Sequence, residues 1–476
     1  SLLADLIENR GGSNSVLSFL DEEEKSTGCL ALKRPGEEWQ LLKSNYIKTS
    51  EIIELLSILK KCVNNLQVTG TSQLKFEIFN KIWNEQKINR LDYYLSVIDR
   101  QIRIGNMLPV PRNDFWKELG EKWDKARAIF NTIYEEAEKY KNIIDRKFQD
   151  FYLQNYEKLI RNTDSPAVFT HQFLSRVFKP RWDPKAGKKG IIMIFDGLRV
   201  DGWEEFLKPV FEERFEVIAS FPGSAILPTE TRLSRKAICA GELPEKFTTA
   251  NEKKLLENWF ENNLGISLNM ESIKDDDTVS AGMTARFKSD IVELIIFNFS
   301  DKNLHGNDQD LAFIYDTGIK EIIRQDVRSL LRELPDDILL FITSDHGFIE
   351  VPENKITISH SYTTEKSDVK YRVARIKNKL TGNEHSKVIC FEADSMGIPV
   401  QLKGYMGGIY KYSYAIFPGA GYSFQRPGPS GGHKERYSHG GLSLAECMVP
   451  MIVMGKKDTI QKPLQIVKIE PQGAFE

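Results

Sequence analysis

The sequence of 476 residues predicts an α/β fold: a parallel sheet sandwiched between helices, with a β-rich insertion and a preceding helical domain. Three observations support this class. Residues 190–195 contain a run of mostly β-branched apolar residues, and Gly190 and Gly197 mark its two ends. Such a run is typical of a strand buried on both faces. After this run, strand-like and helical segments alternate, as in parallel sheets. Before about residue 181 the sequence shows only helical periodicity.

Residues 1–185 are expected to form the helical domain. Ile and Leu recur at three- and four-residue spacing in residues 51–66, and Trp, Phe, Tyr and Ile do so in residues 115–160. No residue here has the spacing of metal ligands, so we interpret the aromatic stripe as a packing surface. This domain would dock on the rest of the chain or on a partner.

Residues 186–460 are expected to form an α/β domain, followed by a C-terminal tail at 461–476. Between residues 350 and 432 the sequence no longer alternates between strand-like and helical segments. Short segments of alternating residues and clusters of Gly and Pro there predict an antiparallel insertion. The predicted helices are 201–215, 231–240, 252–263 and 317–334, and the predicted strands outside the insertion are 190–195, 215–221, 292–299, 338–343 and 449–454.

Composition narrows the class of protein. The 65 basic and 67 acidic residues give a formal charge of −2, which argues against a strongly basic nucleic-acid surface. We find no run of 18 apolar residues and no signal peptide, so neither a membrane partner nor export is expected. The five cysteines are scattered without a CxxC pair, as expected for reduced thiols of a cytoplasmic protein.

Ligand-type residues follow the predicted strands. Asp196 directly follows the first strand, Asp301 and His305 follow the strand at 292–299, and Asp345-His346 follows the strand at 338–343. His439 comes after the insertion. Because parallel strands place their carboxyl ends at one edge of a sheet, these side chains are expected to meet there. Carboxylates and imidazoles together suit zinc, with manganese as the second choice.

One more segment carries hydroxyl groups. Thr229 and Thr231 precede or begin a short predicted helix, whose amino terminus offers N–H donors to a phosphate. Taken alone, Thr231 is better explained as a helix cap.

The order of these motifs resembles the alkaline phosphatase superfamily. Asp196, Thr231, Asp301-x-x-x-His305, Asp345-His346-Gly347 and His439-Gly440-Gly441 occur in the order that this superfamily shows. Within the superfamily the chain looks most like the PglZ domain of BREX phage-exclusion systems and of some response regulators. The resemblance covers residues 190–455, and it is most evident in 195–201, 231–241 and 436–443.

The resemblance implies two divalent metal ions, zinc or alternatively manganese or magnesium. Asp196, Asp345, His346 and the Thr231 hydroxyl would hold one ion. Asp301, His305 and His439 would hold the other. Thr231 would be the nucleophile that receives the phosphoryl group, with Thr229 as the alternative. The arginine that would bind the phosphate is not identified by the motif. The candidates are Arg199, Arg232 and Arg235.

The implied function is a metal-dependent phosphohydrolase, with a preference for phosphodiesters, in phage defence. Its expected partners are a phosphoester substrate, such as a nucleotide or oligonucleotide, and other phage-defence proteins. Two alternatives remain open. The same site suits a phosphomonoesterase or a nuclease, and the domain also suits a metal-stabilised scaffold of a defence complex with little turnover.

Overall fold

The structure is a computed structural model that describes residues 49–107, 114–247, 251–268, 272–274, 291–298, 304, 309–320, 323, 327–359, 361–363, 369–380, 387–399, 401–403, 409–426 and 435–456. The part of the expected helical domain before residue 49 and the expected tail at 461–476 lie outside the described residues.

A six-stranded sheet organises the second part of the chain, in the order β3-β18-β7-β2-β6-β5. The central strand β2 pairs in parallel with β6 on one side and with β7 on the other. The predicted α/β class is therefore confirmed. The strands are β2 (Lys189–Phe195), β3 (Phe215–Ser220), β5 (Ser272–Lys274), β6 (Val292–Phe297), β7 (Ile338–Ser344) and β18 (Met451–Lys456).

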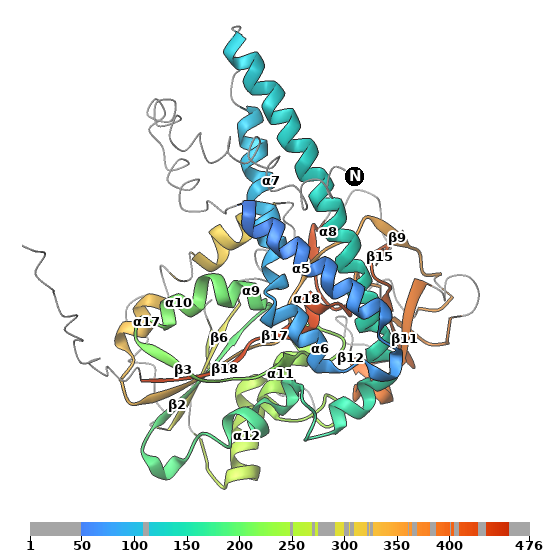
Figure 1. Cartoon of the computed structure of the whole chain (residues 1–476). Coiled ribbons are helices and arrows are strands. Elements are labelled where there is room, and N and C mark those ends of the chain that lie inside the picture. Colours follow the sequence, from blue (N-terminus) through green and yellow to red (C-terminus); the bar gives the residue numbers. More distant parts are fainter. Residues whose placement is uncertain are drawn as a thin grey trace, which may run out of the picture.

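Both faces of the sheet are buried, as the apolar run in β2 predicts. Ile191 and Met193 face one hydrophobic core, while Ile192 and Ile194 face another, because successive side chains of a strand alternate between its faces. Helices cover both sides of the sheet (Figure 1). They are α9 (Val200–Gly202), α10 (Lys208–Phe211), α11 (Thr231–Ala240), α12 (Glu252–Leu264), α15 (Leu311–Ile314) and α17 (Arg328–Glu333), with further turns at Trp203–Leu207 and Tyr315–Ile319.

One strand departs from the parallel pattern. β18 runs antiparallel to both of its neighbours, β3 and β7. The preceding helix α18 (Leu444–Cys447) has only four residues. A crossover that would make β18 parallel to β7 needs a dozen or more residues, which this short helix does not supply. The chain therefore enters β18 from the edge of the sheet at which β7 ends, and β18 runs in the opposite direction. The sheet is thus mixed, with its parallel part around β2.

The described part of the N-terminal region is helical, as predicted. It contains α5 (Thr49–Val68), α6 (Phe76–Asn80), α7 (Leu91–Met107) and the 48-residue α8 (Asp114–Arg161), with short turns at Thr71–Gln73, Lys81–Glu85 and Ile88–Arg90. Figure 1 shows the amino end of α8 projecting at the top of the view and the rest of the helix running down along the α/β domain. Buried residues of α5, α7 and α8 belong to the same hydrophobic core as β2 and α10. The expected domain boundary at 185/186 stays a prediction.

The region predicted as a β-rich insertion contains short strands that do not join the six-stranded sheet. A three-stranded antiparallel sheet has the order β10-β14-β11, and two further pairs are β12-β13 and β15-β9. The bounds are β9 (Asn354–Ile356), β10 (Ala374–Ile376), β11 (Val388–Glu392), β12 (Gln401–Lys403), β13 (Ile409–Lys411), β14 (Tyr414–Pro418) and β15 (Tyr422–Phe424).

Smaller strands connect these parts. A three-stranded sheet has the order β1-β4-β17, and β8 pairs with β16 beside the site. The bounds are β1 (Val168–Phe169), β4 (Gly223–Ser224), β8 (Ile349–Glu350), β16 (Tyr437–Ser438) and β17 (Met448–Val449), with helical turns at Thr170–Gln172, Phe173–Phe178, Pro184–Ala186 and Asp394–Met396. Within the described residues, none of the helices has the length and apolar character needed to span a bilayer.

Candidate functional site

Two neighbouring strands bring three ligand-type side chains together. Asp196 follows β2, and Asp345-His346 follows β7. One ligand atom from each of these residues lies within 4.8 Å of the others, and all three residues are buried. Gly197 permits the turn here because its φ is 67°, a value that side chains disfavour. Its N–H donates to Asp345 Oδ1 at 2.9 Å, which joins the two strand ends.

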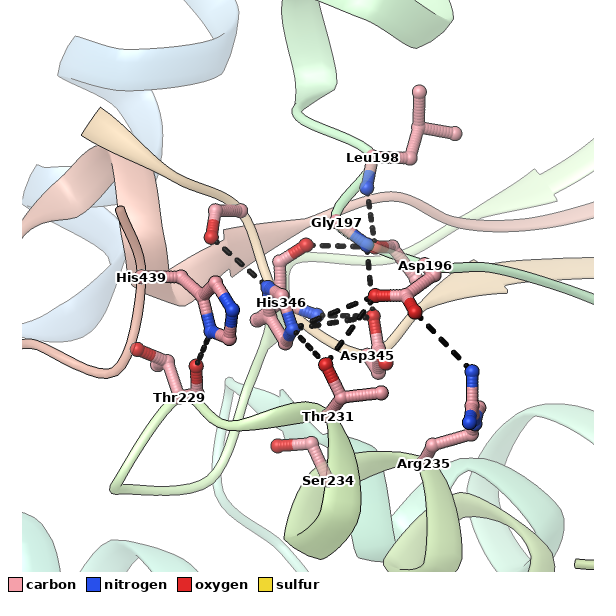
Figure 2. A network of polar contacts seen from close by, with 12 residues as sticks. Asp196, Gly197, Leu198, Thr229, Thr231, Ser234, Arg235, Asp345, His346 and His439 are labelled. Atoms are coloured by element: carbon pink, nitrogen blue, oxygen red, sulfur yellow. Dashed lines mark hydrogen bonds and ion pairs between the residues drawn. The ribbon is translucent and has the colours of Figure 1, made fainter. Parts of the chain in front are cut away.

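Thr231 reaches the same cluster from the first position of α11. Its hydroxyl oxygen lies 2.9 Å from Nε2 of His346 and 3.4 Å from Asp196 Oδ1. Figure 2 shows the Thr231 side chain pointing between these two groups. The structure therefore brings together all four residues predicted for one metal ion.

Backbone contacts orient the imidazole of His346. Its Nδ1 lies 3.0 Å from the carbonyl oxygen of Gly347, so this nitrogen carries the proton and Nε2 presents a lone pair to the cluster. Nε2 is 3.6 Å from Asp196 Oδ1 and 3.9 Å from Asp345 Oδ1. A Cβ atom at Gly347 would lie 2.0 Å from the Ala445 carbonyl oxygen, so only glycine fits after His346.

His439 lies beside His346. The two rings are stacked, with centroids 4.0 Å apart and planes inclined by 9° (Figure 2). Nδ1 of His439 is 3.0 Å from the carbonyl oxygen of Thr229, so its proton is held there and Nε2 remains a possible ligand. The hydroxyl of Thr229 is buried between Gly440 N and Gly441 O, at 3.1 and 2.9 Å. These contacts give Thr229 a structural role, and they favour Thr231 over Thr229 as the nucleophile.

The cluster has the properties of a cation site. Asp345 Oδ2 is buried and makes no hydrogen bond with any residue that the structure describes, a state that is costly for a carboxylate oxygen unless a cation neutralises it. Two carboxylates and one imidazole with its lone pair turned inward suit zinc or manganese. The residues present thus fit a divalent metal ion. Asp301 and His305, predicted for the second ion, lie outside the described residues.

Among the three candidate arginines, Arg235 contacts the cluster directly. Its guanidinium donates to Asp196 Oδ2 at 3.2 Å, to Asn298 Oδ1 at 2.8 Å and to Glu252 Oε1 at 3.1 Å. Burial alone would lower the pKa of Arg235, but Asp345, Asp196 and Glu252 outweigh burial and raise this pKa. Arg235 therefore fixes the Asp196 carboxylate and is itself largely neutralised by these acids.

The other two arginines lie in different surroundings. Arg199 is 2% exposed and pairs with Asp92 of α7 and with Asp201, both at 2.9 Å. This position does not support the predicted phosphate-binding role of Arg199, because its charge is used to join the helical region to the α/β domain. Arg232 is exposed on the first turn of α11, next to Thr231.

Sequence reasoning missed a set of polar contacts from α8 that supports the site. Gln149 donates to the Leu442 carbonyl oxygen at 2.8 Å and accepts from Ala420 N at 3.0 Å. The hydroxyl of Tyr156 accepts from Leu227 N at 2.6 Å. Leu442 follows the His439 loop and Leu227 precedes Thr231, so α8 holds segments beside both. The helical spacing of residues 149 and 156 in an aromatic stripe was the available signal, although packing alone also explains it.

The insertion supplies a second set of contacts that the sequence did not predict. Glu230, the N-cap residue of α11, is 2% exposed and pairs with Arg375 of β10 and with Lys370. Arg372 makes a bidentate pair with Glu446, from Nε to Oε1 at 3.2 Å and from Nη2 to Oε2 at 2.9 Å, and the Glu446 carboxylate also accepts from Gly441 N at 2.8 Å. The insertion therefore contacts the residues next to both Thr231 and His439.

A separate pocket of about 310 Å³ lies between the helical region and the α/β domain. Asp92, Lys141 and Asp145 are among its lining residues, but the residues of the metal cluster are not. The chemistry suggested by the cluster therefore belongs to the sheet edge and not to this pocket.

Comparison with known proteins adds three findings. A family model described as the BREX system PglZ alkaline phosphatase-like domain matches residues 173–454, more than half of the chain. Murine ectonucleotide pyrophosphatase/phosphodiesterase 5, solved as an inactive variant in complex with AMP, is 15% identical, with 56% of this chain and 88% of that chain covered and a TM-score of 0.35. The human protein gives the same identity and coverage, with a TM-score of 0.37. No curated protein matches the chain.

Proposed function

This chain belongs to the BREX system PglZ family of alkaline phosphatase-like domains, and from that premise we propose that it is a metal-dependent phosphodiesterase of phage defence. The observation that carries the proposal is the cluster of Asp196, Asp345 and His346, two of whose members, Asp196 and His346, contact the hydroxyl of Thr231. A threonine hydroxyl is a weak nucleophile by itself, and an adjacent base or a coordinated metal ion is what activates such a group.

In the proposed reaction, Thr231 Oγ1 attacks the phosphorus atom and the bond from phosphorus to the leaving oxygen breaks. Water then cleaves the bond between phosphorus and Thr231, which restores the hydroxyl. Divalent metal ions, when bound, would lower the pKa of the threonine and neutralise charge on the phosphoryl oxygens. Asp196, Asp345 and His346 would hold one ion, with zinc favoured over manganese or magnesium. Asp301, His305 and His439 would hold the second.

The charge near the cluster supports a diester substrate. A monoester dianion is best held by an additional guanidinium whose charge is not already used. Arg235 already contacts Asp196, Glu252 and Asn298. A diester has one negative charge and needs less compensation, so a nucleotide or oligonucleotide diester fits this site better than a monoester.

The test combines metal analysis with two model substrates. Protein purified without chelator should contain zinc or manganese and should hydrolyse bis-p-nitrophenyl phosphate with a higher kcat/KM than p-nitrophenyl phosphate. Thr231→Ala should lower kcat by about 1,000-fold or more while most of the metal stays bound, because the charged ligands remain. Thr231→Ser should retain part of the activity.

Other outcomes would change the proposal in defined ways. Equal or greater monoester efficiency that Thr231→Ala also removes would indicate a phosphomonoesterase, and cleavage of DNA or RNA alone would indicate a nuclease. Metal content without turnover of any ester would indicate the scaffold. Protein that neither contains nor can be loaded with a transition metal would overturn the metal site itself.

A further inference from the structure

Arg199 joins the helical region to the loop that follows β7. Its side chain is 2% exposed. Nη2 donates to Oδ2 of Asp92 in α7 at 2.9 Å and to the carbonyl oxygen of Asn89 at 3.3 Å, while Nε donates to Oδ1 of Asp201 at 2.9 Å. Nη1 donates to the carbonyl oxygen of Phe348 at 3.3 Å. One guanidinium can bind all of these acceptors because its N–H groups point in several fixed directions.

The loop at 345–348 contains His346, and Arg199 contacts the two residues that follow it. A Cβ atom at Gly347 would lie 3.3 Å from Cγ of Arg199, and the Arg199 guanidinium lies 5.4 Å from the ring centroid of Phe348. The Gly347 carbonyl oxygen in turn accepts from Nδ1 of His346 at 3.0 Å, which turns Nε2 toward the metal cluster. Arg199 therefore packs against the peptide that orients the imidazole.

The helical region holds Arg199 through Asp92. Lys141 of α8 and Arg199 both pair with the Asp92 carboxylate. Burial by itself would raise the pKa of Asp92, but Lys141 and Arg199 outweigh burial and hold this pKa well below its usual range. Asp92 is therefore ionised, and its contacts connect α7, α8 and Arg199. Since Arg199 also contacts the loop of His346, a continuous series of contacts runs from two helices of the N-terminal region to a predicted metal ligand.

We propose that Arg199 is a positioning residue for His346 and that Asp92 holds Arg199 in this position, so that the candidate metal site reaches its full affinity only with the helical region docked. The inference rests on the metal site of the proposed function, but not on the nucleophile or the substrate class. Removal of a group that orients a metal-ligating histidine lowers metal affinity by about 10- to 100-fold. An ion pair that only joined two regions would change stability without this effect.

The first test measures zinc affinity by competition with a chromogenic chelator. Arg199→Lys keeps the positive charge but replaces the guanidinium with one ammonium group, which cannot hold Asp92 and the Phe348 carbonyl together. This variant should bind zinc about 10-fold more weakly than the wild-type protein. Arg100→Lys is the matched control and should bind zinc as tightly as the wild type. Arg100 of α7 also makes an ion pair with the α/β domain, at 2.8 Å, but within the described residues it donates no hydrogen bond to the loop at 345–348.

The contribution of the helical region is tested with Asp92→Asn, which keeps the size of the side chain and removes its charge. This variant should also bind zinc more weakly than the wild type. The double variant Asp92→Asn/Arg199→Lys should bind zinc about as weakly as Arg199→Lys alone, because both changes act through the same contact. Losses that multiply would show that the two residues act independently, and unchanged affinity in Asp92→Asn would remove the helical region from the proposal.

A measurement without metal or substrate separates this inference from the proposed function. Nitrogen NMR of metal-free protein with ¹⁵N-labelled histidine reports which ring nitrogen carries the proton, and His346→Gln assigns the His346 signals by their loss. The wild-type ring should carry the proton on Nδ1, and Arg199→Lys should show a mixture of both tautomers. If no zinc binds but this change is present, the positioning role stands and the metal-dependent reaction fails. A lower melting temperature in Arg199→Lys with unchanged zinc affinity and tautomer would overturn the inference.

Discussion

The helix α8 and the β-rich insertion both support segments beside Thr231 and His439, but they do so by different chemistry. From α8, Gln149 and Tyr156 use uncharged groups to bind backbone atoms of Leu442, Ala420 and Leu227. From the insertion, Arg375 and Arg372 use charges to bind the carboxylates of Glu230 and Glu446. These last two contacts lie in fully or nearly fully buried surroundings.

The neutral contacts of α8 and the charged contacts of the insertion contribute to the site in different ways. A neutral hydrogen bond to the backbone adds modest net stability. It also fixes the position of the bound backbone segment, because a backbone atom cannot turn away as a side chain can. A buried ion pair is expensive to desolvate and fails badly when one partner is removed. We therefore expect α8 to set the position of the site and the insertion to set its charge. Variants in the insertion and in α8 test this contrast.

The largest effect is expected in the insertion. Arg375→Met leaves the buried Glu230 with Lys370 as its remaining ion-pair partner within the described residues, and should lower the free energy of unfolding by about 3 kcal/mol. Adding Glu230→Gln should restore most of this loss, because the uncompensated charge is then gone. Urea unfolding of the two single variants and the double variant measures the coupling. A single-variant loss below about 1 kcal/mol would remove the charge argument.

A smaller effect is expected in α8. Gln149→Leu leaves the buried Leu442 carbonyl and the Ala420 amide without their side-chain partner and should lower the free energy of unfolding by about 2 kcal/mol. Its affinity for zinc should also fall, because Leu442 follows the His439 loop. Gln154→Leu, at an exposed position of the same helix, is the control. Loss of stability with unchanged zinc affinity would show that α8 supports the fold but not the site.

A pH dependence is also expected in α8. Burial raises the pKa of Asp145 to about 7, although Leu444 N donates to its Oδ1. An unfolded aspartate titrates near pH 4, so the folded protein binds more protons between these values and stability falls as pH rises toward 7. Asp145→Asn keeps the acceptor and removes the charge. Its melting temperature relative to wild type should therefore be higher at pH 8 than at pH 5, by about 2 °C or more. A constant difference would contradict the raised pKa.

The sequence predicted the sheet edge well because the signals there are local. A buried strand followed by Asp196, a second followed by Asp345-His346 and a helix that begins at Thr231 all appear where predicted. The direction of β18 was not predicted, because residue pattern does not distinguish parallel from antiparallel pairing in a buried strand. The position of Arg199 was also missed, since its partner Asp92 is 107 residues away.

The supports of the site escaped prediction for the same reason. Gln149 lies in a stripe whose aromatic neighbours do pack in the core, so its role depends on backbone atoms that the sequence does not place nearby. Glu230 and Arg375 are 145 residues apart, and neither has a motif. Division into domains, the second metal ion and the cytoplasmic location remain predictions.

The contacts of α8 also set an order of events during synthesis. Gln149 is made 293 residues before Leu442, the residue whose carbonyl it binds. At roughly 5–20 residues per second, a ribosome needs about 15–60 s to cover this distance. During that interval Gln149 has been made, but the Leu442 carbonyl that it binds has not. The geometry of the candidate site is therefore completed only after the residues that follow His439 have been made and contact α8.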